Sequence, residues 1–564
     1  MDGWVGKLLR VDLTGGNYRV ADLNPVLAKK FIGGRGLATK IFFDEVDPMV
    51  DPLSADNKLI FATGPSTGAA LGSSRYMVVT KSPLTGTIAC SNSGGSFGPK
   101  LKFAGYDLII FEGRAEEPVY LSIVDDEVEI KPAHHLWGRN THETEDMIRD
   151  EIGDPWKARE TGIACIGPAG EKLVKIAAII NDKHRAAGRS GVGTVMGSKN
   201  LKAIAVRGTK GVNVASSEKF HENTLSFLDS IKKSPSTNLE TANSYPNQGT
   251  PRFTNFLSPK GIFPVRNFQG GVFEEVAKIN GEALRNATWK GRAACFSCPI
   301  GCGRVTKATA PGFEGEGEGP EYETIALFGG SCGVGNISAI AKASYICNEL
   351  GLDTIDMGGA IACAMELFER GFLPENEIGV KLNFGNAEFM VKLVRQTGLR
   401  QGFGDMLAEG GYRMAERYEH PELFMGVKKQ SFAGYEPRAM KGMGLGYATS
   451  NRGACHMKGN TSAAELSDPY SIEGKAAALK PIQDLVTAFD SGGFCFFPVI
   501  RGVPAGKTPD LVLSILETAT GAGYDMKSML SAGERIWNLE RLFNLRAGFT
   551  RKDDNLPPRM LEEP

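Results

Sequence analysis

The hydrophobic pattern of the chain changes near residue 210, and this change constrains the fold more than any other feature. Before it, six short apolar runs are separated by Gly, Asp, Asn or Pro, and several carry the β-branched pairs of half-buried strands. They are KLLRVDL, NKLIFATG, RYMVVTKS, DLIIFEG, PVYLSIV and KAIAVRG. After it, apolar residues recur with helical spacing. The sequence therefore predicts an α+β protein with a β-rich domain over residues 1–210 and a helical part beyond it.

The helical part contains several segments with an apolar face and end signals. In 338–351 the apolar face ends at Leu350, with Ser338 as the expected N-cap and Gly351 as the stop. Segments 356–372, 387–397 and 510–520 are similar. A helix is also expected from Pro481, placed in its first turn, to the Gly492-Gly493 pair. The polar, Pro-rich tail 553–564 is predicted to be an arm or a disordered end.

Composition and charge exclude several classes of protein. The 564 residues are 42% hydrophobic with a net charge of −1, which provides no footprint for nucleic acid or an acidic membrane. The N-terminus lacks a secretory h-region, and no run approaches the roughly 18 apolar residues of a spanning helix. A cytoplasmic protein without membrane insertion is expected. The 70 Gly residues predict many tight turns or backbone brought close to a ligand.

Three cysteines in CFSCPIGC form a CxxCxxxC run, namely Cys295, Cys298 and Cys302. Clustered cysteines in such a chain favour a metal site or catalysis over disulfides. Structural zinc usually draws its ligands as two local pairs, and no second pair is present here. A triplet with one distant cysteine suits a [4Fe–4S] cluster better. Zinc in a structural or scaffold protein, and inert thiols, are the alternatives.

The fourth ligand must come from the seven remaining cysteines. Cys347 and Cys363 lie on apolar helix faces, where most cysteines are small core residues. Cys495 ends DSGGFC at a Gly-rich helix end that can present it outward, and it is the predicted fourth ligand. The same stretch, 490–495, echoes NELGLD at 348–353, because both follow (N/D)xxG(L/F)(D/C). Two matched helix ends predict two matched halves of a ligand site.

Together, CxxCxxxC, DxxGxC, NxxGLD and the Gly-rich N-terminal half resemble the aldehyde:ferredoxin oxidoreductases. These are tungsten or molybdenum enzymes with two pyranopterins and one [4Fe–4S] cluster. The resemblance runs from GWVGKLLRVDL to the final helices. It implies a pterin-binding β domain over 1–210 and two mainly helical domains, 211–420 with CxxCxxxC and 421–564 with DxxGxC. It also implies that the cluster is held by Cys295, Cys298, Cys302 and Cys495.

The resemblance implies two pterin-binding motifs. They consist of Asn348, Gly351, Leu352 and Asp353, and of Asp490, Gly493 and Phe494. The family usually has Asp at the first position of the first motif, whereas Asn348 offers hydrogen bonds without charge. Lys458 resembles a further pterin contact.

Other N-terminal residues resemble the family's cofactor contacts. Arg75, in SSRYMVV, looks like the arginine between cluster and pterin, where a permanent cation raises the reduction potential of an anionic cluster. Two Gly-rich loops resemble those that hold a Mg²⁺ bridging the pterin phosphates. Their residues are Asn92, Ser93, Gly94 and Gly95, and Arg185, Ala186 and Gly188.

Two residues are the predicted acid–base groups. Glu323, in EGPEYET, precedes an apolar run that can carry it inward, where burial raises a carboxylate's pKa. Glu314, Glu316 and Glu318 are expected in a solvated loop. His456, in GACHMKG, lies in a stretch that faces the metal pocket in the family. The resemblance implies that the pair polarises an aldehyde carbonyl and accepts a proton as the carboxylic acid forms.

Electrons would leave singly through a pterin and the cluster to an external carrier, either ferredoxin or an iron–sulfur partner subunit. Homodimerisation is common in the family, and a hetero-oligomer is the other expected assembly. The main rival is a catalytic subunit like those of class II benzoyl-CoA reductases, in which a cysteine thiolate ligates tungsten. Cys332 and Cys455 are the candidates for that thiolate, although no clear basic track for CoA is present. Oxidation of a sugar or of glyceraldehyde 3-phosphate is a third variant.

Overall fold

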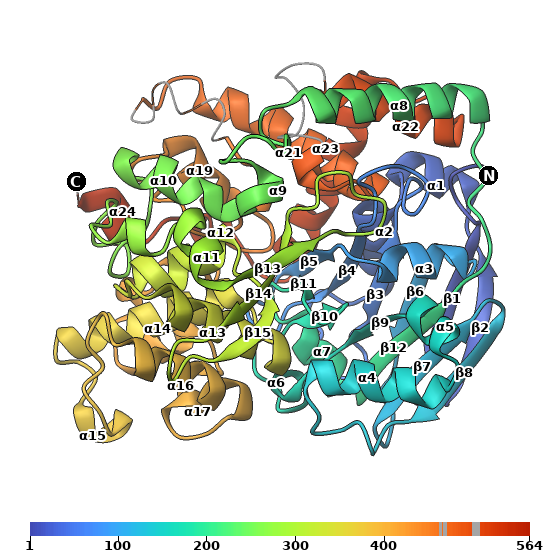
Figure 1. Ribbon diagram of the computed structural model, residues 1–564. Coiled ribbons are helices and arrows are strands. Elements are labelled where there is room, and N and C mark those ends of the chain that lie inside the picture. Colours follow the sequence, from blue (N-terminus) through green and yellow to red (C-terminus); the bar gives the residue numbers. More distant parts are fainter. Residues whose placement is uncertain (462–464, 466–467, 469–470, 499–507, 564) are drawn as a thin grey trace.

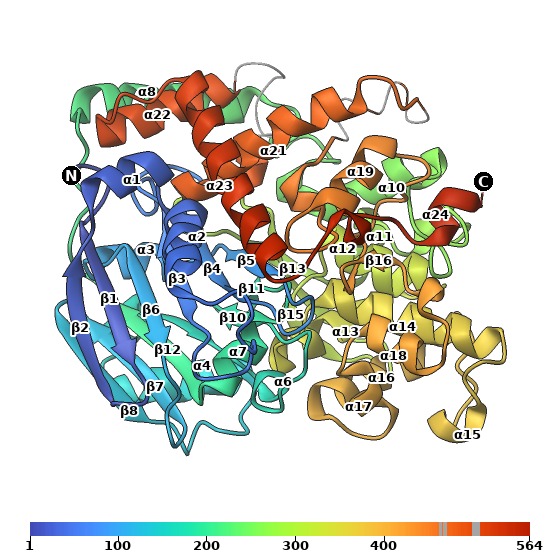
Figure 2. The same cartoon turned by 180° about the vertical axis from the view of Figure 1, so that it is seen from behind.

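Two six-stranded β-sheets, a three-stranded sheet, a short hairpin and a larger set of helices make up the described part of the protein (Figure 1). The structure is a computed structural model that describes residues 1–461, 465, 468, 471–498 and 508–563. Figure 1 places the sheets on one side and the helices beside and above them, and Figure 2 shows the same arrangement from behind. The predicted α+β class is confirmed, with a β-rich N-terminal region followed by a mainly helical one.

The first sheet uses residues 7–112, which we call half A. Its strand order is β2-β1-β6-β3-β4-β5, and β1 and β6 are its parallel pair. The strands are β1 (Lys7–Asp12), β2 (Asn17–Asp22), β3 (Leu59–Thr63), β4 (Tyr76–Lys81), β5 (Ile88–Ser93) and β6 (Leu108–Glu112). Its helices are α1 (Pro25–Phe31), α2 (Gly34–Glu45) and α3 (Phe97–Phe103).

The second sheet uses residues 119–207, which we call half B. Its order is β11-β10-β9-β12-β7-β8, with β7 and β12 parallel. The strands are β7 (Val119–Val124), β8 (Glu127–Pro132), β9 (Gly162–Cys165), β10 (Ile179–Asn181), β11 (Arg185–Ala187) and β12 (Leu201–Arg207). Its helices are α4 (Thr141–Ile152), α5 (Pro155–Glu160), α6 (Pro168–Glu171) and α7 (Val192–Ser198).

The two halves have the same topology. In each, the first strand pairs antiparallel with the second and parallel with the sixth. The sixth then pairs with the third, the third with the fourth, and the fourth with the fifth. In each, two helices follow the second strand and one helix follows the fifth. The domain is therefore an internal structural duplication, which the sequence analysis did not detect.

One core cluster joins the two sheets. Leu9 and Val11 of β1 pack in the same cluster as Leu121 and Ile204 of half B, whereas Leu8 belongs to a cluster on the other face of its sheet. This alternation follows from the period of two in a strand. The matching edge strands β5 and β11 pack against each other. Equivalent residues of the two halves are thereby brought to one place.

Beyond residue 207, the described residues contain helices, one three-stranded sheet and one short hairpin. The strands are β13 (Trp289–Ala293), β14 (Gly303–Ala308), β15 (Gly315–Glu318), β16 (Gly426–Val427) and β17 (Gln430–Ser431). The helices up to residue 399 are α8 (Ser217–Lys233), α9 (Tyr245–Gln248), α10 (Thr254–Leu257), α11 (Gly281–Thr288), α12 (Tyr322–Ile325), α13 (Ile337–Leu350), α14 (Thr354–Glu369), α15 (Glu375–Ile378) and α16 (Ala387–Leu399). The later helices are α17 (Phe403–Leu407), α18 (Gly411–Arg417), α19 (Lys441–Thr449), α21 (Lys475–Gly492), α22 (Thr508–Thr520), α23 (Met526–Arg546) and α24 (Pro558–Glu562).

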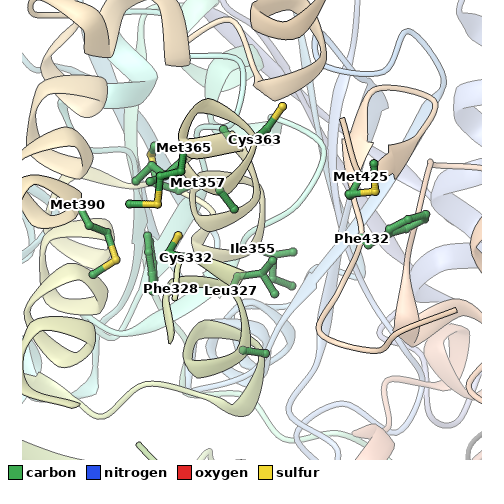
Figure 3. Packing of buried hydrophobic residues seen from close by; sticks show 14 of the residues in the cluster. Leu327, Phe328, Cys332, Ile355, Met357, Cys363, Met365, Met390, Met425 and Phe432 are labelled. Carbon is green, nitrogen blue, oxygen red and sulfur yellow. The ribbon is translucent and has the colours of Figure 1, made fainter. Parts of the chain in front are cut away.

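The largest core cluster lies within the helical part. Figure 3 shows part of its packing, in which Cys332 lies beside Phe328, whereas the Cys363 side chain points away from Met357 and Met365. Both thiols are fully buried in this apolar core. A second cluster covers the outer face of the half A sheet with α21, α22 and α23. The outer face of the half B sheet has only a small cluster, to which α4 contributes.

Some predicted helix ends differ from those observed. Asn336, not Ser338, caps α13, because its side chain accepts from the Ser338 and Ala339 amides. Pro481 lies inside α21, which begins earlier, at Lys475. The C-terminal tail is docked rather than free, since the buried Arg559 donates to Glu366 of α14. Gly351 and Gly493 end their helices as predicted, both with positive φ.

No helix among the described residues is both long enough and apolar enough to cross a membrane.

Candidate active site

One cavity of about 320 Å³ lies between the N-terminal domain and the helical part, and it gathers most of the predicted site residues. The four cysteines of the predicted cluster line it, together with Glu323 and His456. The other predicted residues in its lining are Arg75, Asn92, Ser93, Gly94, Arg185, Ala186, Gly188, Asn348, Leu352 and Asp353. Predicted residues that are up to 420 positions apart therefore meet at one place.

The CxxCxxxC loop lies against the Gly-rich turn after β5. The Phe296 amide donates to the Gly95 carbonyl (3.1 Å). A Cβ at Gly94 would lie 2.9 Å from the Cys295 sulfur, so a larger residue would push the cysteine loop away. Gly95 has φ 84°, and a Cβ there would collide with the Asp182 carboxylate of half B. These glycines let the cysteine loop and the two halves approach closely.

Cys495 reaches the same cavity from the end of α21. Its amide donates to the Gly72 carbonyl (2.9 Å), and the Gly72 amide in turn donates to the Ser297 carbonyl (3.2 Å). Gly72 thus joins the fourth cysteine to the triplet loop. Burial raises the pKa of Cys298 to about 11, and it raises the pKa of Cys302 well above its ordinary value.

Arg75 lies beside the sulfur atoms. Its Nη2 donates to the Cys495 sulfur (3.1 Å), and its backbone amide donates to the Gly493 carbonyl (3.3 Å). Burial lowers the pKa of Arg75, but Cys495 and Cys295 more than offset this, so the guanidinium stays protonated. A permanent cation therefore faces two of the four sulfurs.

The two echoed motifs hold equivalent positions in the two halves. At the end of α21, the Ser73 hydroxyl and the Arg75 amide donate to the Gly493 carbonyl, and the Gly36 amide at the start of α2 donates to Ser491. At the end of α13, the Ala178 amide donates to the Gly351 carbonyl. Each helix end is therefore seated by the loop before the fourth strand of one half.

The charged contacts differ between the two ends. The Lys458 ammonium, itself 3% exposed, donates to Asp490 (2.7 Å), and Arg35 of α2 lies 3.4 Å from the same carboxylate. The matching residue Asn348 has a neutral side chain. Its backbone carbonyl accepts a hydrogen bond from the Thr141 hydroxyl at the start of α4 (2.7 Å). Lys458, Asp490, Gly351, Gly493, Phe494 and Gly95 are predicted residues that surround the cavity without lining it.

Glu323 and His456 face each other. The distance from His456 Nε2 to Glu323 Oε1 is 3.4 Å, and the two side chains are 14% and 12% exposed. The Gly434 amide donates to Glu323 Oε2 (2.6 Å), which fixes the carboxyl group. Glu323 Oε1 and His456 Nδ1 make no hydrogen bond in the described structure. Two polar atoms are thus buried at the cavity without a partner, as expected where a ligand binds.

Burial sets the proton state of this pair. Burial raises the pKa of Glu323 to about 7, although the Gly434 amide and Arg189 oppose the shift. Burial lowers the pKa of His456 to about 3, and Arg189 and Arg452 lower it further. Near neutral pH the imidazole is therefore neutral, while the carboxyl group is close to half protonated, as suits an acid–base group.

Several site residues were missed or misread. Glu318 is not a solvated loop residue, because β15 buries it at the cavity, 2.9 Å from Arg185. Arg189 was missed, although this buried residue lies 3.3 Å from Asp353 and donates to the Ser431 and Ala454 carbonyls. Arg304 was also missed. It donates to the Cys302 carbonyl and pairs with Glu321 (2.8 Å), joining the cysteine loop to the segment that carries Glu323.

Neither of the two other candidate thiolates lines the cavity. Cys332 is buried in the apolar core, where its thiol lies 3.6 Å from the Gly358 carbonyl (Figure 3). Cys455 is 1% exposed and lies 2.9 Å from Arg452. Among the described residues that line the cavity, the cysteines are the four of the predicted cluster.

The donor set fits an iron–sulfur cluster better than one zinc ion. Zinc bound by four thiolates at about 2.3 Å requires sulfurs within about 4 Å of one another. No three His, Cys, Asp or Glu side chains in the described parts of the chain converge tightly enough to hold a single metal ion. Four thiols around one cavity, with Arg75 and Arg185 beside them, instead suit a larger anionic group.

Comparisons with known proteins identify the family. Residues 8–208 match the family model of the aldehyde ferredoxin oxidoreductase N-terminal domain, and residues 226–564 match that of domains 2 and 3. The chain is 46% identical to the tungsten-containing aldehyde ferredoxin oxidoreductase of Pyrococcus furiosus over 575 residues, covering 100% of this chain and 92% of that protein. It is 32% identical over 593 residues to the aliphatic sulfonate oxidoreductase, WOR-like subunit, of the same organism, with coverage of 100% and 90%.

A solved structure is also similar. It is the active site complex BamBC of benzoyl coenzyme A reductase with 1,5-dienoyl-CoA, with a TM-score of 0.83 and 27% sequence identity. The similarity covers 99% of this chain and 91% of that one. The family models and the 46% identity show the family, and the chain belongs to the aldehyde ferredoxin oxidoreductases.

Proposed function

We propose that the protein is a tungsten or molybdenum bis-pyranopterin oxidoreductase that oxidises aldehydes to carboxylic acids. The observation that carries this proposal is the meeting of four cysteines, two echoed helix ends and a buried Glu–His pair at one cavity. The relatives named as tungsten-containing aldehyde ferredoxin oxidoreductases support it.

The cofactors are assigned to residues in the same way. We assign a [4Fe–4S] cluster to Cys295, Cys298, Cys302 and Cys495, and one pterin to each helix end. Asn92 of β5 and Ala186 of β11 lie on the matching edge strands that pack together, which supports a Mg²⁺ bridging the two pterin phosphates there. When bound, the metal and its pterins supply the two-electron redox chemistry.

Glu323 and His456 would act on the aldehyde. The neutral imidazole would hydrogen-bond the carbonyl oxygen of the aldehyde or a hydroxyl group of its hydrate, and water supplies the second oxygen of the carboxylic acid. Glu323, with its pKa near 7, accepts the proton released as the acid forms and passes it on. Gly434 holds the carboxyl group so that Oε1 points at His456 rather than turning away.

Arg75 and the cysteine loops would provide the electron exit. Arg75 touches the Cys495 sulfur and is held by the Gly493 carbonyl of the adjacent helix end. A fixed cation there stabilises the electron added to the cluster. A [4Fe–4S] cluster held there would carry one electron at a time, so ferredoxin or an iron–sulfur partner would have to take the two electrons singly.

The deciding experiment is anaerobic purification followed by measurement of Fe, W, Mo and Zn per chain. We expect about four Fe and about one W or Mo, and reduction of viologen dyes with aldehydes as donors. Activity with an aliphatic sulfonate or an aromatic acyl-CoA, and none with aldehydes, would reject the aldehyde as substrate. One Zn without Fe, W or Mo would reject the cluster and the redox function together.

A further inference from the structure

A second cavity, of about 870 Å³, lies apart from the active site and shares none of its lining residues. It lies between the turn after β4, helix α18, the β16–β17 hairpin and the segment after α23; β16 and α18 are labelled in Figure 2. Its lining is basic, with Arg413, Lys428, Lys429 and Lys552 against the acids Glu422 and Asp553. Tyr412, Phe424 and Phe549 add aromatic walls.

The hairpin presents its lysines in a costly conformation. Lys428 and Lys429 have φ values of 51° and 65°, in the left-handed region. A two-residue hairpin turn of this kind favours Asn and Gly, which tolerate positive φ. Residues held in such a conformation cost free energy and cluster at ligand sites. The formation of a tight turn therefore does not explain why lysines occupy positions 428 and 429.

The lysines differ in their partners. Lys428 is anchored, since its ammonium lies 2.6 Å from Asp554 and donates to the Ala448 carbonyl. Lys429 lies over the Tyr412 ring, 5.2 Å from its centroid. No carboxylate of the described residues forms an ion pair with Lys429 or Arg413. Arg413 donates to two backbone carbonyls, those of Glu409 and Pro83.

The two cations act on each other within the cavity. Burial lowers the pKa of Lys429, and repulsion from Arg413 lowers it further, against the attraction of Glu416. The two acids in the lining already have donors, because Glu422 accepts from His420 and Asp553 accepts from the Thr550 amide. Two partly buried cations thus face one space, and no carboxylate of the described residues lies within ion-pair distance of either of them, although Glu422 and Asp553 also line the cavity.

We propose that this cavity is a binding site for a small organic oxyanion, a carboxylate or a phosphate ester, held between Arg413 and Lys429. The guanidinium donates one bond from each terminal nitrogen to a backbone carbonyl and keeps further N–H groups for the anion, and the Lys429 ammonium supplies a second charge-assisted bond. The aromatic walls pack against the organic body of the ligand. This proposal does not depend on the redox function, because neither the lining nor the contacts include a cofactor residue.

The test measures binding by isothermal titration calorimetry and by thermal shift, on the purified holoenzyme at constant ionic strength in chloride. The probes are inorganic phosphate, adenosine monophosphate and benzoate. The central variant is Lys429→Asn, which removes the charge and relaxes the turn. We expect it to melt at a higher temperature than the wild type without ligand, and to bind the anion at least about tenfold more weakly.

Arg413→Gln provides a second loss of charge in the same cavity, with the same expected weakening of binding. Lys392→Gln is the matched control, since Lys392 also lies over a ring, 5.4 Å from the Phe389 centroid, but on the exposed surface of α16. It should bind as the wild type does.

Saturable binding of any probe, lost in both cavity variants and kept in the control, supports the site. The preferred probe then shows whether free phosphate, a phosphate ester or a carboxylate is the source. Absence of saturable binding for all three probes, or equal binding by the cavity variants and the wild type, would overturn the proposal.

Discussion

The two halves of the N-terminal domain share one strand order but meet their helix ends with different chemistry. Half A seats the end of α21, where Asp490 lies between Lys458 (2.7 Å) and Arg35 (3.4 Å). Half B seats the end of α13, where the neutral Asn348 takes the place of that carboxylate; the Asn348 backbone carbonyl accepts from the Thr141 hydroxyl. The backbone is duplicated, whereas the charge is not.

The last residue of each motif differs as well. Cys495 follows the half A helix end and contacts Arg75, whereas Asp353 follows the half B end and contacts Arg189. The duplication therefore fixes two equivalent positions, and single residues then decide what each one does. In the proposed function, only the half A side leads to the cluster.

The proposed catalytic pair draws one member from each side. Glu323 precedes α13, whose end half B seats, and His456 precedes α21, whose end half A seats. They meet 3.4 Å apart at the cavity. The acid–base pair therefore forms where the segment before α13 meets the segment before α21.

The strongest test of the comparison exchanges the last residue of the half A motif. Cys495→Ser should abolish viologen reduction by aldehydes, because the proposed cluster loses a ligand and the electron exit with it. Iron per chain should fall, while W or Mo remains bound. Metal analysis and electron paramagnetic resonance of the reduced enzyme measure both effects.

Cys363→Ala is the control, since that thiol is buried in the apolar core (Figure 3). It should keep its iron. Full iron content in Cys495→Ser, with unchanged activity, would show that the half A end is not the cluster side and would remove the proposed asymmetry.

The next largest effect is expected at the junction. Glu323→Gln should lower kcat/KM by about 10²–10⁴, the usual range for loss of a general acid–base group. In the wild type, kcat/KM should rise with pH through about 7, as Glu323 ionises. The variant should lack this limb of the pH profile. A profile that keeps its rise near pH 7 in Glu323→Gln would assign the titration to another group.

Glu323→Gln should lower the activity but raise the free energy of unfolding at pH 8. Burial raises the pKa of Glu323 above its unfolded value, so its stabilising proton is fully present below about pH 4.5 and is lost as pH rises to about 7. Above that pH, burying the charge costs on the order of 3 kcal/mol. The variant should therefore unfold at higher denaturant concentration than the wild type at pH 8, and nearly equally at pH 4.5.

The third prediction concerns the buried charges of half A. Arg35 donates to Glu540 and Thr487, and all three side chains are buried. Arg35→Met should lower the free energy of unfolding by about 3–5 kcal/mol, because Glu540 is left as a buried charge without its partner. Urea unfolding measures the loss. Arg19→Met, on the exposed strand β2, is the control and should have little effect. A small loss in Arg35→Met would mean that half A does not depend on its charges.

The structural features that could be predicted from the sequence are those that depend on local residue pattern. The echo of 348–353 and 490–495 was visible because both helix ends need Gly with positive φ. The duplication was not visible, since strand order depends on pairing between distant residues such as Leu9 and Ile109. Local pattern also places Ser338 at a helix start, although Asn336 is the cap.

The sequence analysis failed mainly to predict which charged residues are buried. Arg35 and Arg189 lie in Gly-rich, polar stretches that resemble surface loops, and Glu318 follows an acidic run. Each is buried because a partner from a distant segment neutralises it, namely Glu540, Asp353 and Arg185. Such a partner cannot be identified from spacing, because the pairing distance along the chain is set by the tertiary fold.

The smallest expected effect comes from making half B resemble half A. Asn348→Asp restores the carboxylate of the echoed motif, but the two cations that flank Asp490 belong to α2 and to the segment of Lys458. Without them, the partly buried carboxylate introduced at position 348 should have a raised pKa, so its stabilising proton is lost as pH rises from about 4. The variant should be about 1 kcal/mol less stable than the wild type at pH 8 and equal to it at pH 4, by urea unfolding of the cofactor-free protein. Asp490→Asn, the reciprocal exchange, leaves the buried Lys458 without its carboxylate and should cost more, about 1–3 kcal/mol. Equal costs for the two exchanges would mean that both helix ends lie in the same electrostatic environment, and that the halves differ in residue names alone.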